Sequence, residues 1–258
     1  MRKLRVGSVP YINAAPLTRW LETDEAKPYA EVVYAPPSAL ARMLQARELD
    51  VALVSSIEQA RREDVRPVAN LGIASRDEVL SVRLFCKTPL RHVRTVALDT
   101  SSLTSAALTR ILFERACGVQ VEYQHAAPDL DAMLQGADAA LLIGDRGMTA
   151  THPAVRETLD LGKAWRAYTG LPFVWAKWLV NAETPEAPLA ELLQRAYQWG
   201  AAHIDAIVAG ESQRTGIPHA LCERYLKSVM VYALDATMEA GFERFLREYA
   251  ALQRQDTP

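Results

Sequence analysis

The chain has 258 residues, of which 50% are hydrophobic and 23% are charged, and its formal net charge is −2. This composition suits one large globular domain or two smaller α/β lobes, and it provides neither a basic field for nucleic acid nor an acidic tail for a basic partner. The three cysteines are far apart in apolar stretches, which favours reduced thiols packed as small hydrophobes over disulfides or a metal site: Cys86, Cys117 and Cys222.

The N-terminal segment combines a strand, a polar turn and a helix. Its basic start is followed by an apolar stretch that Gly7, Ser8 and Pro10 interrupt, so we expect no signal peptide. No later stretch approaches about 20 apolar residues, and we expect a cytoplasmic protein without membrane contact. Residues 4–9 have strand composition, Pro10 ends the pairing, and a helix is predicted over 14–22 with Asn13 at its cap. The free amides and positive end of that helix favour an anion, although an ordinary N-cap explains Asn13 equally well.

The same unit of strand, polar turn and helix occurs twice more. A strand is predicted over 31–35 with a helix behind it, and the apolar run 50–54 runs into Ser55-Ser56 and a helix over 57–62. Three such units predict a parallel sheet, whose ligands bind beyond the carboxyl ends of its strands. Asn13 and Ser55 would share that edge, and simple helix capping remains the alternative for Ser55-Ser56.

From residue 65 the pattern changes to longer extended stretches, 68–74 and 79–87, which are typical of antiparallel or crossover strands. A second α/β lobe follows, with predicted strands over 96–99, 119–123 and 139–143, helices over 102–117 and 128–134, and a return strand over 173–180. Predicted helices over 189–208, 220–229 and 235–252 complete the chain. We therefore expect a discontinuous lobe I, 1–90 with 175–258, and a lobe II, 91–174.

Two α/β lobes joined by two crossover strands would form a cleft, the usual place for a small-molecule site. Polar residues at strand ends and helix starts are the candidates to line it: Asn13, Ser55, Ser56, Ser81, Asp99, Ser101, Ser102, Thr104, Ser105, Gly144 and Asp145. Taken singly, each hydroxyl is more often a cap than a ligand contact, and only a shared sheet edge favours binding. The five histidines are scattered, with no spacing that indicates a metal site or a catalytic triad.

Several motifs resemble the chorismate dehydratases of the futalosine route to menaquinone, in the same order along nearly the whole chain. They are Val6-Gly7-Ser8-Val9-Pro10-Tyr11-Ile12-Asn13-Ala14-Ala15-Pro16-Leu17, residues 50–58, Ser81-Val82-Arg83-Leu84-Phe85, Leu98-Asp99 with Thr104-Ser105, Ile143-Gly144-Asp145, Asp160-Leu161-Gly162, residues 170–176, and the closing helix pattern around Tyr225-Leu226 and Gly241-Phe242. Ile12 and Ala15 depart from the usual motif, but neither change removes a polar group.

The resemblance implies a type II periplasmic-binding-protein fold and the elimination of water from chorismate, a small dicarboxylate, to give 3-[(1-carboxyvinyl)oxy]benzoate without metal or organic cofactor. By motif position it implies that Asn13, Ser55, Ser81, Thr104 and Ser105 bind the substrate, with Gly144 and Asp145 nearby. We assign Asn13 and Ser81 to catalysis and the remaining candidates to substrate binding. We expect no nucleic-acid or membrane partner, and the sequence leaves the oligomeric state open.

The residue inventory suits this chemistry. Hydroxyls, an amide and helix N-termini can hold two carboxylates through charge-assisted hydrogen bonds, and the same donors would stabilise the delocalised anion formed by proton loss. The base could be the enolpyruvyl carboxylate of chorismate itself or a protein side chain such as Asp145 or Asp99.

Three alternatives remain. The related enzyme that forms 1,4-dihydroxy-6-naphthoate has a different N-terminal motif, against which Val9-Pro10-Tyr11-Ile12-Asn13 argues. A small-anion-binding protein that serves a transporter would normally carry a signal peptide. A ligand-sensing pair of lobes would normally carry an effector domain.

Overall fold

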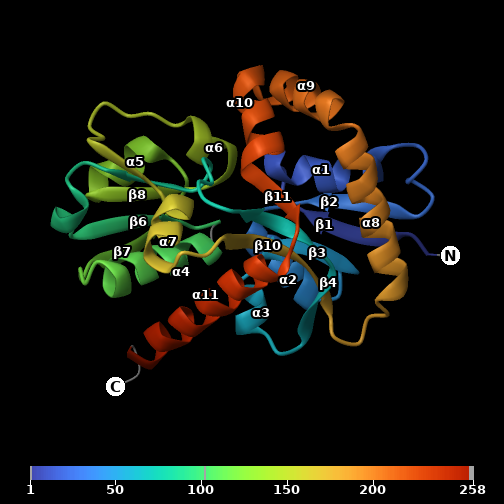
Figure 1. Ribbon diagram of the computed structural model, residues 1–258, viewed down its shortest axis with the longest axis horizontal. Helices are drawn as coiled ribbons and strands as arrows, with labels where there is room; N and C mark the ends of the chain where they lie inside the picture. The colour runs from blue at the N-terminus through green and yellow to red at the C-terminus, as the bar shows by residue number, and fades with distance from the viewer. Residues whose placement is uncertain (1, 102, 256–258) are drawn as a thin grey trace. The chain divides into compact units, whose positions relative to one another are not determined.

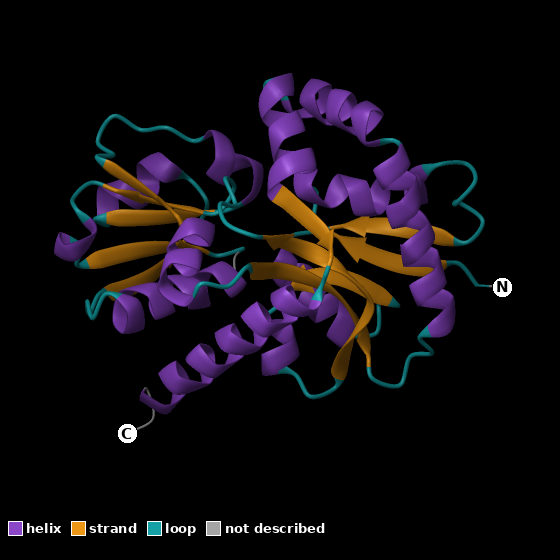
Figure 2. Ribbon diagram, viewed as in Figure 1, coloured by secondary structure: helices purple, strands orange, loops and turns teal. Residues whose placement is uncertain are grey.

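A computed structural model describes residues 2–101 and 103–255. The chain divides into two compact units (Figure 1): unit 1 comprises Met1–Ala74 and Val174–Asp235, and unit 2 comprises Ser75–Phe173 and Ala236–Pro258. Each unit is built on one mixed β-sheet with helices packed against it (Figure 2).

The sheet of unit 1 has six strands, in the order β11 (Met230–Ala233), β4 (Val65–Ser75), β10 (Phe173–Asn181), β3 (Val51–Ser55), β1 (Leu4–Ser8) and β2 (Ala30–Tyr34). Strand β1 pairs in parallel with both β2 and β3, which confirms the parallel arrangement predicted for the first three units. Strand β10 returns antiparallel to β3, with Ala176 opposite Ser55. All five residues of β3 are buried, as its continuous apolar run indicates.

The helices of unit 1 are α1 (Ala15–Thr18), α2 (Pro37–Gln45), α3 (Glu58–Arg61), α8 (Ala187–Ala202), α9 (Ile204–Thr215) and α10 (His219–Glu223). Helix α1 packs on α8 at a position where only glycine fits. A Cβ atom placed on Gly200 would lie 1.9 Å from the carbonyl oxygen of Pro16. Gly200 therefore sets how closely α8 approaches the segment that carries Asn13.

The sheet of unit 2 has five strands, in the order β7 (Glu122–Ala126), β6 (Thr95–Asp99), β8 (Ala139–Leu142), β5 (Arg83–Cys86) and β9 (Glu157–Asp160). Its helices are α4 (Thr104–Ile111), α5 (Leu130–Gly136), α6 (Gly144–Thr149), α7 (Leu161–Thr169) and α11 (Ala236–Gln255). Strand β6 is parallel to β7 and β8, whereas β5 is antiparallel to β8 and β9. Phe85, Ala97 and Met133 belong to the core cluster that joins this sheet to α5.

The two units differ in extent from the expected lobes, because residues 75–90 and 236–258 group with unit 2. Strand β5 lies between β8 and β9, which fixes the first of these segments in the second sheet. In α11, the ring of Phe245 packs edge-on against that of Phe173, with 5.1 Å between centroids. Both segments are placed by tertiary contacts that hydrophobic periodicity does not encode.

Two further expectations were wrong in detail. The helix predicted over 14–22 is broken into a 3₁₀ turn (Ile12–Ala14), α1 and a second 3₁₀ turn (Arg19–Glu22). Cys117 is exposed after a π-helical turn (Leu112–Ala116), whereas Cys86 and Cys222 are buried as expected. All three cysteines are free thiols.

Candidate functional site

Asn13 does not cap a helix. The N-cap of α1 is Ala14, which makes no side-chain cap hydrogen bond, because the 3₁₀ turn inserts one extra turn between Pro10 and α1. The Asn13 side chain instead reaches across unit 1, where its Nδ2 donates a hydrogen bond to Tyr225 Oη at 3.1 Å. Its Oδ1 is buried and finds no hydrogen-bond partner among residues 2–101 and 103–255. Asn13 therefore offers a buried acceptor that the described part of the chain leaves open.

Tyr225 belongs to a π-helical turn, Arg224–Val229, and is 1% exposed. π-Helical turns are rare and often occur at functional sites, because the wider turn reorients a side chain. A phenol hydroxyl both donates and accepts, so Tyr225 can pair with either end of the Asn13 amide. The resemblance includes Tyr225-Leu226, but sequence reasoning gave Tyr225 no role in the site, since nothing in the local pattern connects positions 212 residues apart.

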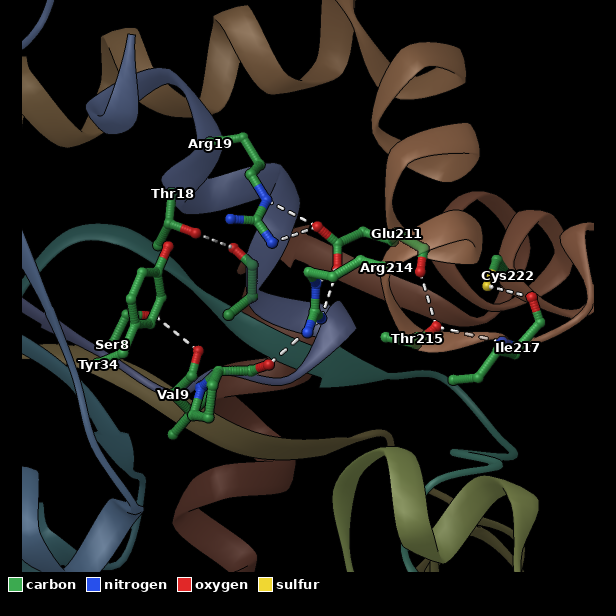
Figure 3. Close-up of polar contacts among 12 residues, drawn as sticks. Ser8, Val9, Thr18, Arg19, Tyr34, Glu211, Arg214, Thr215, Ile217 and Cys222 are labelled. Carbon is green, nitrogen blue, oxygen red and sulfur yellow. Dashed lines mark hydrogen bonds and ion pairs between the residues drawn. The ribbon is translucent and has the colours of Figure 1, made fainter.

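A pocket of about 190 Å³ adjoins the N-terminal motif within unit 1. Its lining residues are Val9, Pro10, Tyr11, Ala15, Thr18, Arg19, Tyr34 and Arg214. Figure 3 shows that both arginine side chains reach the carboxylate of Glu211, which is 3% exposed. Arg19 Nε lies 2.7 Å from Glu211 Oε1, and Arg214 Nε lies 2.8 Å from Oε2.

Charges in this cluster balance one another. Burial lowers the pKa of Arg19, but hydrogen bonds and charge attraction from Glu22 and Glu211 outweigh it and raise the pKa above its ordinary value. Burial also raises the pKa of Tyr34 to about 12, so this hydroxyl stays protonated at neutral pH. Two guanidinium groups thus face two carboxylates, and the cluster holds α9 to the segment after β1.

Ser55 is the last residue of β3, and Ser56 follows it in the turn before α3. Neither caps α3, whose N-cap is Ile57 and has no side-chain cap hydrogen bond. Ser56 Oγ donates to the carbonyl oxygen of Val174 at 2.7 Å and so joins β3 to β10. Because β1 and β3 are parallel neighbours, Ser55 and the segment with Asn13 follow the carboxyl ends of adjacent strands. Unit 1 therefore places Ser55 and the segment with Asn13 at the same edge of its sheet.

Unit 2 gathers its candidate residues at one edge of its own sheet. Asp99 ends β6, and Gly144 follows β8, the parallel neighbour of β6. Strand β5 runs the other way, with Arg83 opposite Leu142, so Ser81 precedes β5 at this same edge. Three polar segments far apart in sequence thus meet at the carboxyl end of β8.

Asp99 organises the loop that follows β6. Its carboxylate is 1% exposed and accepts hydrogen bonds from the backbone N–H of Ser101, at 2.9 Å, and from the Ser101 hydroxyl. Thr104 and Ser105 begin α4 and are buried, but the N-cap is Leu103, without a side-chain cap bond. Ser102 lies outside the described residues. Asp99 shapes the loop, and the two buried hydroxyls in the first helical turn do not serve as the cap.

Gly144 begins α6 with a backbone φ of 62°, a conformation that favours glycine. Asp145 follows in the first turn of α6 and is half-buried. Ser81, in contrast, is 1% exposed, and its backbone N–H donates to the carbonyl oxygen of Val79 at 2.7 Å. Gly144 therefore lies at a left-handed backbone position, and Ser81 lies at the end of a tight turn.

Within the described part of the chain, no group of three or more His, Cys, Asp or Glu side chains is arranged to hold a metal ion. In the same residues, no helix has the length and apolar character needed to cross a membrane.

Comparisons with known proteins match this chain over nearly its full length. A family model described as menaquinone biosynthesis matches residues 4–251. A chorismate dehydratase from Thermus thermophilus is 32% identical over 263 aligned residues, which cover 95% of this chain and 94% of the relative. A chorismate dehydratase from Campylobacter jejuni is 30% identical and covers 66% of this chain and 65% of the relative.

Solved structures show the same fold at low sequence identity. A protein from Archaeoglobus fulgidus superposes with a TM-score of 0.76 and 18% identity, covering 98% of both chains. A Candida albicans protein described as having the generic periplasmic binding protein fold superposes with a TM-score of 0.67 and 12% identity, covering 97% of this chain and 91% of that one. The fold expected from the sequence is confirmed.

Proposed function

The chain belongs to the menaquinone biosynthesis family, and on that basis we propose that it is a chorismate dehydratase. It would eliminate water from chorismate to give 3-[(1-carboxyvinyl)oxy]benzoate. Two relatives of that name support the proposal, one of them along nearly the whole of both chains. The cytoplasmic location, the small dicarboxylate substrate and the lack of a cofactor are parts of the same proposal.

The structural observation that carries the proposal is the Asn13 amide. A buried polar atom without a partner costs about 1–3 kcal/mol, and Asn13 Oδ1 is such an atom. The leaving hydroxyl of chorismate is a donor that would fill this position. Because Tyr225 Oη can also donate to Oδ1, rotation of the amide would instead turn Nδ2 toward a substrate carboxylate. Either orientation gives the amide a partner on the substrate.

Neutral donors would stabilise the charge that develops during the reaction. The hydrogen on the ring carbon that bears the enolpyruvyl ether is acidic through conjugation with the ring carboxylate, so its removal gives a delocalised anion. Departure of the adjacent hydroxyl then makes the ring aromatic. Ser81, Thr104 and Ser105 are buried hydroxyl residues of unit 2 that we assign to holding this anion.

We assign the role of base to the enolpyruvyl carboxylate of the substrate. It is tethered close to the acidic hydrogen, and a tethered group gains a large effective concentration. Asp99 is committed to the Ser101 amide and hydroxyl, which suits a loop-shaping role. Asp145 is the remaining protein carboxylate among the candidate residues.

The charge on the substrate suits unit 1 as well. Chorismate carries two carboxylates, and Arg214 lines the pocket beside Pro10 and Tyr11 with a side chain that is 44% exposed. Sequence reasoning missed Arg19 and Arg214, because an arginine within a helical segment usually lies on the solvent-exposed face of the helix.

The test is to mix the purified chain with chorismate and to follow ultraviolet absorbance, with the product identified by its mass. Conversion to an aromatic product that has lost one water supports the proposal. Saturable binding without turnover would indicate a carrier or sensor of small anions and would contradict it. Asn13→Asp is the matched variant, because it keeps the size of the side chain while placing a negative charge beside a dianion.

A further inference from the structure

The carboxylate of Asp160 is a hub for backbone amides from two segments of unit 2. It accepts hydrogen bonds from Gly162 at 2.9 Å and Lys163 at 3.1 Å, the amides of the first turn of α7. It also accepts from Leu80 at 2.8 Å and from Val79 at 3.1 Å, about 80 residues earlier in the chain. Helix capping alone accounts for only the first pair.

The second pair holds a turn that ordinary residues avoid. Leu80 has a backbone φ of 60°, in the left-handed region where a side chain is unfavourable. The N–H of Ser81 bonds to the carbonyl oxygen of Val79 at 2.7 Å, which closes a tight three-residue turn. Such a conformation persists only where its surroundings impose it. The hydrogen bonds that the N–H groups of Val79 and Leu80 donate to the Asp160 carboxylate impose it.

The turn places the backbone of Ser81 against α6, the helix that begins with the candidate residues Gly144 and Asp145. A Cβ atom placed on Gly147 would lie 2.3 Å from the carbonyl oxygen of Ser81, so the backbone of this residue packs directly on α6. A Cβ atom on Gly162 would lie 2.3 Å from the carbonyl oxygen of Asp77, so α7 is equally close to the start of the loop. The segment 77–81 is therefore packed against α7 at its start and against α6 at its end. A shift of the Val79–Ser81 turn would move Ser81.

We propose that Asp160 is a positioning residue for Ser81: its carboxylate fixes the Val79–Ser81 turn and thereby the place of the Ser81 hydroxyl. The catalytic consequence rests on the proposed function, whereas the geometric part does not. Asp160 does not touch the reacting atoms in this proposal and acts only through Ser81.

Asp160→Asn separates positioning from capping. Asn is as good an N-cap as Asp, so its one acceptor oxygen keeps the bonds to α7 and one of the two contacts with the N–H of Val79. Its NH₂ group then opposes the N–H of Leu80, which bonds only to the other oxygen of Asp160. Asp129→Asn is the matched control, because Asp129 caps α5 through Ala132 N at 3.0 Å and has no link to this loop. If Asp160→Asn folds poorly, Asp160→Ser replaces it, since Ser caps α7 but is too short to reach the loop.

The first measurement is amide hydrogen exchange of the folded, ligand-free chain, which needs no substrate. Asp160→Asn should speed exchange at Leu80 by about tenfold or more, and Asp129→Asn should leave this exchange unchanged. Unchanged protection in the Asp160 variants would overturn the proposal whether or not the chain dehydrates chorismate.

The second measurement is a double-mutant cycle on chorismate turnover with Ser81→Ala. Asp160→Asn alone should lower kcat by about tenfold with little change in KM, because a misplaced group costs rate more than binding. In the Ser81→Ala background, Asp160→Asn should lower kcat by less than about twofold. If the losses in kcat of the two single variants multiply in the double variant, the two residues act independently and the proposal is overturned. A wild-type chain that does not turn over chorismate would refute the proposed function and leave the exchange result to decide the role of Asp160.

Discussion

Asn13 Nδ2 lies 3.1 Å from Tyr225 Oη, although 212 residues separate them in the chain. The pair joins the 3₁₀ turn after the first strand to a π-helical turn near the end of unit 1. Because Oδ1 of the same amide lacks a partner among the described residues, the phenol decides which face of Asn13 is presented. Replacement of either residue should therefore have functional effects larger than its structural effects.

Tyr225→Phe removes the hydroxyl and keeps the buried ring. We expect kcat/KM for chorismate to fall by about tenfold, because the loss of an interaction worth about 1.4 kcal/mol changes a rate by that factor. The melting temperature should stay within a few degrees of wild type. Tyr29→Phe, at a side chain that is 52% exposed, is the control and should change neither quantity. Full activity of Tyr225→Phe would show that Asn13 needs no orienting partner.

Asn13→Asp should fold and lose most turnover. The Tyr225 hydroxyl can donate to the new carboxylate, so the local packing survives, but a negative charge then faces a dianionic substrate. We expect a loss of at least about a hundredfold in kcat/KM, which corresponds to about 2.7 kcal/mol. Circular dichroism establishes the fold, and ultraviolet assays establish the rate. Near-native activity would return Asn13 to a purely structural role.

Asp99→Asn and Asp145→Asn test the identity of the base. If the substrate supplies the base, single-turnover rates of the folded, saturated variants should stay within about tenfold of wild type, since a general base contributes about 10²–10⁴-fold. Asp99→Asn should weaken stability or binding instead, because Asp99 shapes the loop through Ser101. Abolished chemistry in saturated Asp145→Asn would identify Asp145 as the base.

Gly200→Ala tests the packing of α8 on α1. A Cβ atom 1.9 Å from the Pro16 carbonyl oxygen forces the helices apart, and we expect a loss of about 1–3 kcal/mol in the free energy of unfolding. Gly210→Ala, in α9 with nothing within 4 Å, should instead gain about 0.5–1 kcal/mol. Urea unfolding of both variants measures the difference, and equal midpoints would contradict the packing argument.

Glu248 makes the stability of unit 2 depend on pH. Burial raises the pKa of its carboxyl, but hydrogen bonds from Arg115 and Arg244 outweigh burial and lower the pKa below its ordinary value. A carboxyl with a depressed folded pKa stabilises the fold above its unfolded pKa of about 4.3, and this contribution is lost as the pH falls through the folded value.

Glu248→Gln should therefore lower the free energy of unfolding by about 1–2 kcal/mol at pH 7 and flatten its decline below about pH 5. Glu243→Gln, at an exposed side chain 4.0 Å from Arg247, is the control and should change little. Urea titrations from pH 7 to pH 3 make the comparison. Parallel curves for wild type and Glu248→Gln would exclude this carboxylate as the source.

Most strands and the parallel pairing of β1 with β2 and β3 were predictable, because a buried parallel strand such as β3 is a continuous apolar run between polar turns. Strands β9 and β11 were not predicted. That Asn13 does not cap a helix was not predictable, since a 3₁₀ turn and an α-helix share the same local composition. Tyr225 beside Asn13, Gly147 beside Ser81 and Arg19 beside Glu211 come from distant segments, and only the folded chain brings them together. The boundary of unit 2 depends on the pairing of β5 and the packing of Phe245, which are tertiary as well.

The discontinuity of unit 1 has a consequence during synthesis. Residues 1–74 leave the ribosome first, but β10, which pairs with β3, and Tyr225 emerge only after the central segment of unit 2. At about 5–20 residues per second, the 212 residues that separate Asn13 from Tyr225 take about 10–40 s to translate. In the part of this interval before β10 emerges, the nascent chain exposes the edge of β3 as an unpaired strand, so chaperone binding to emerging chains should peak before residue 174 and fall once β10 has paired.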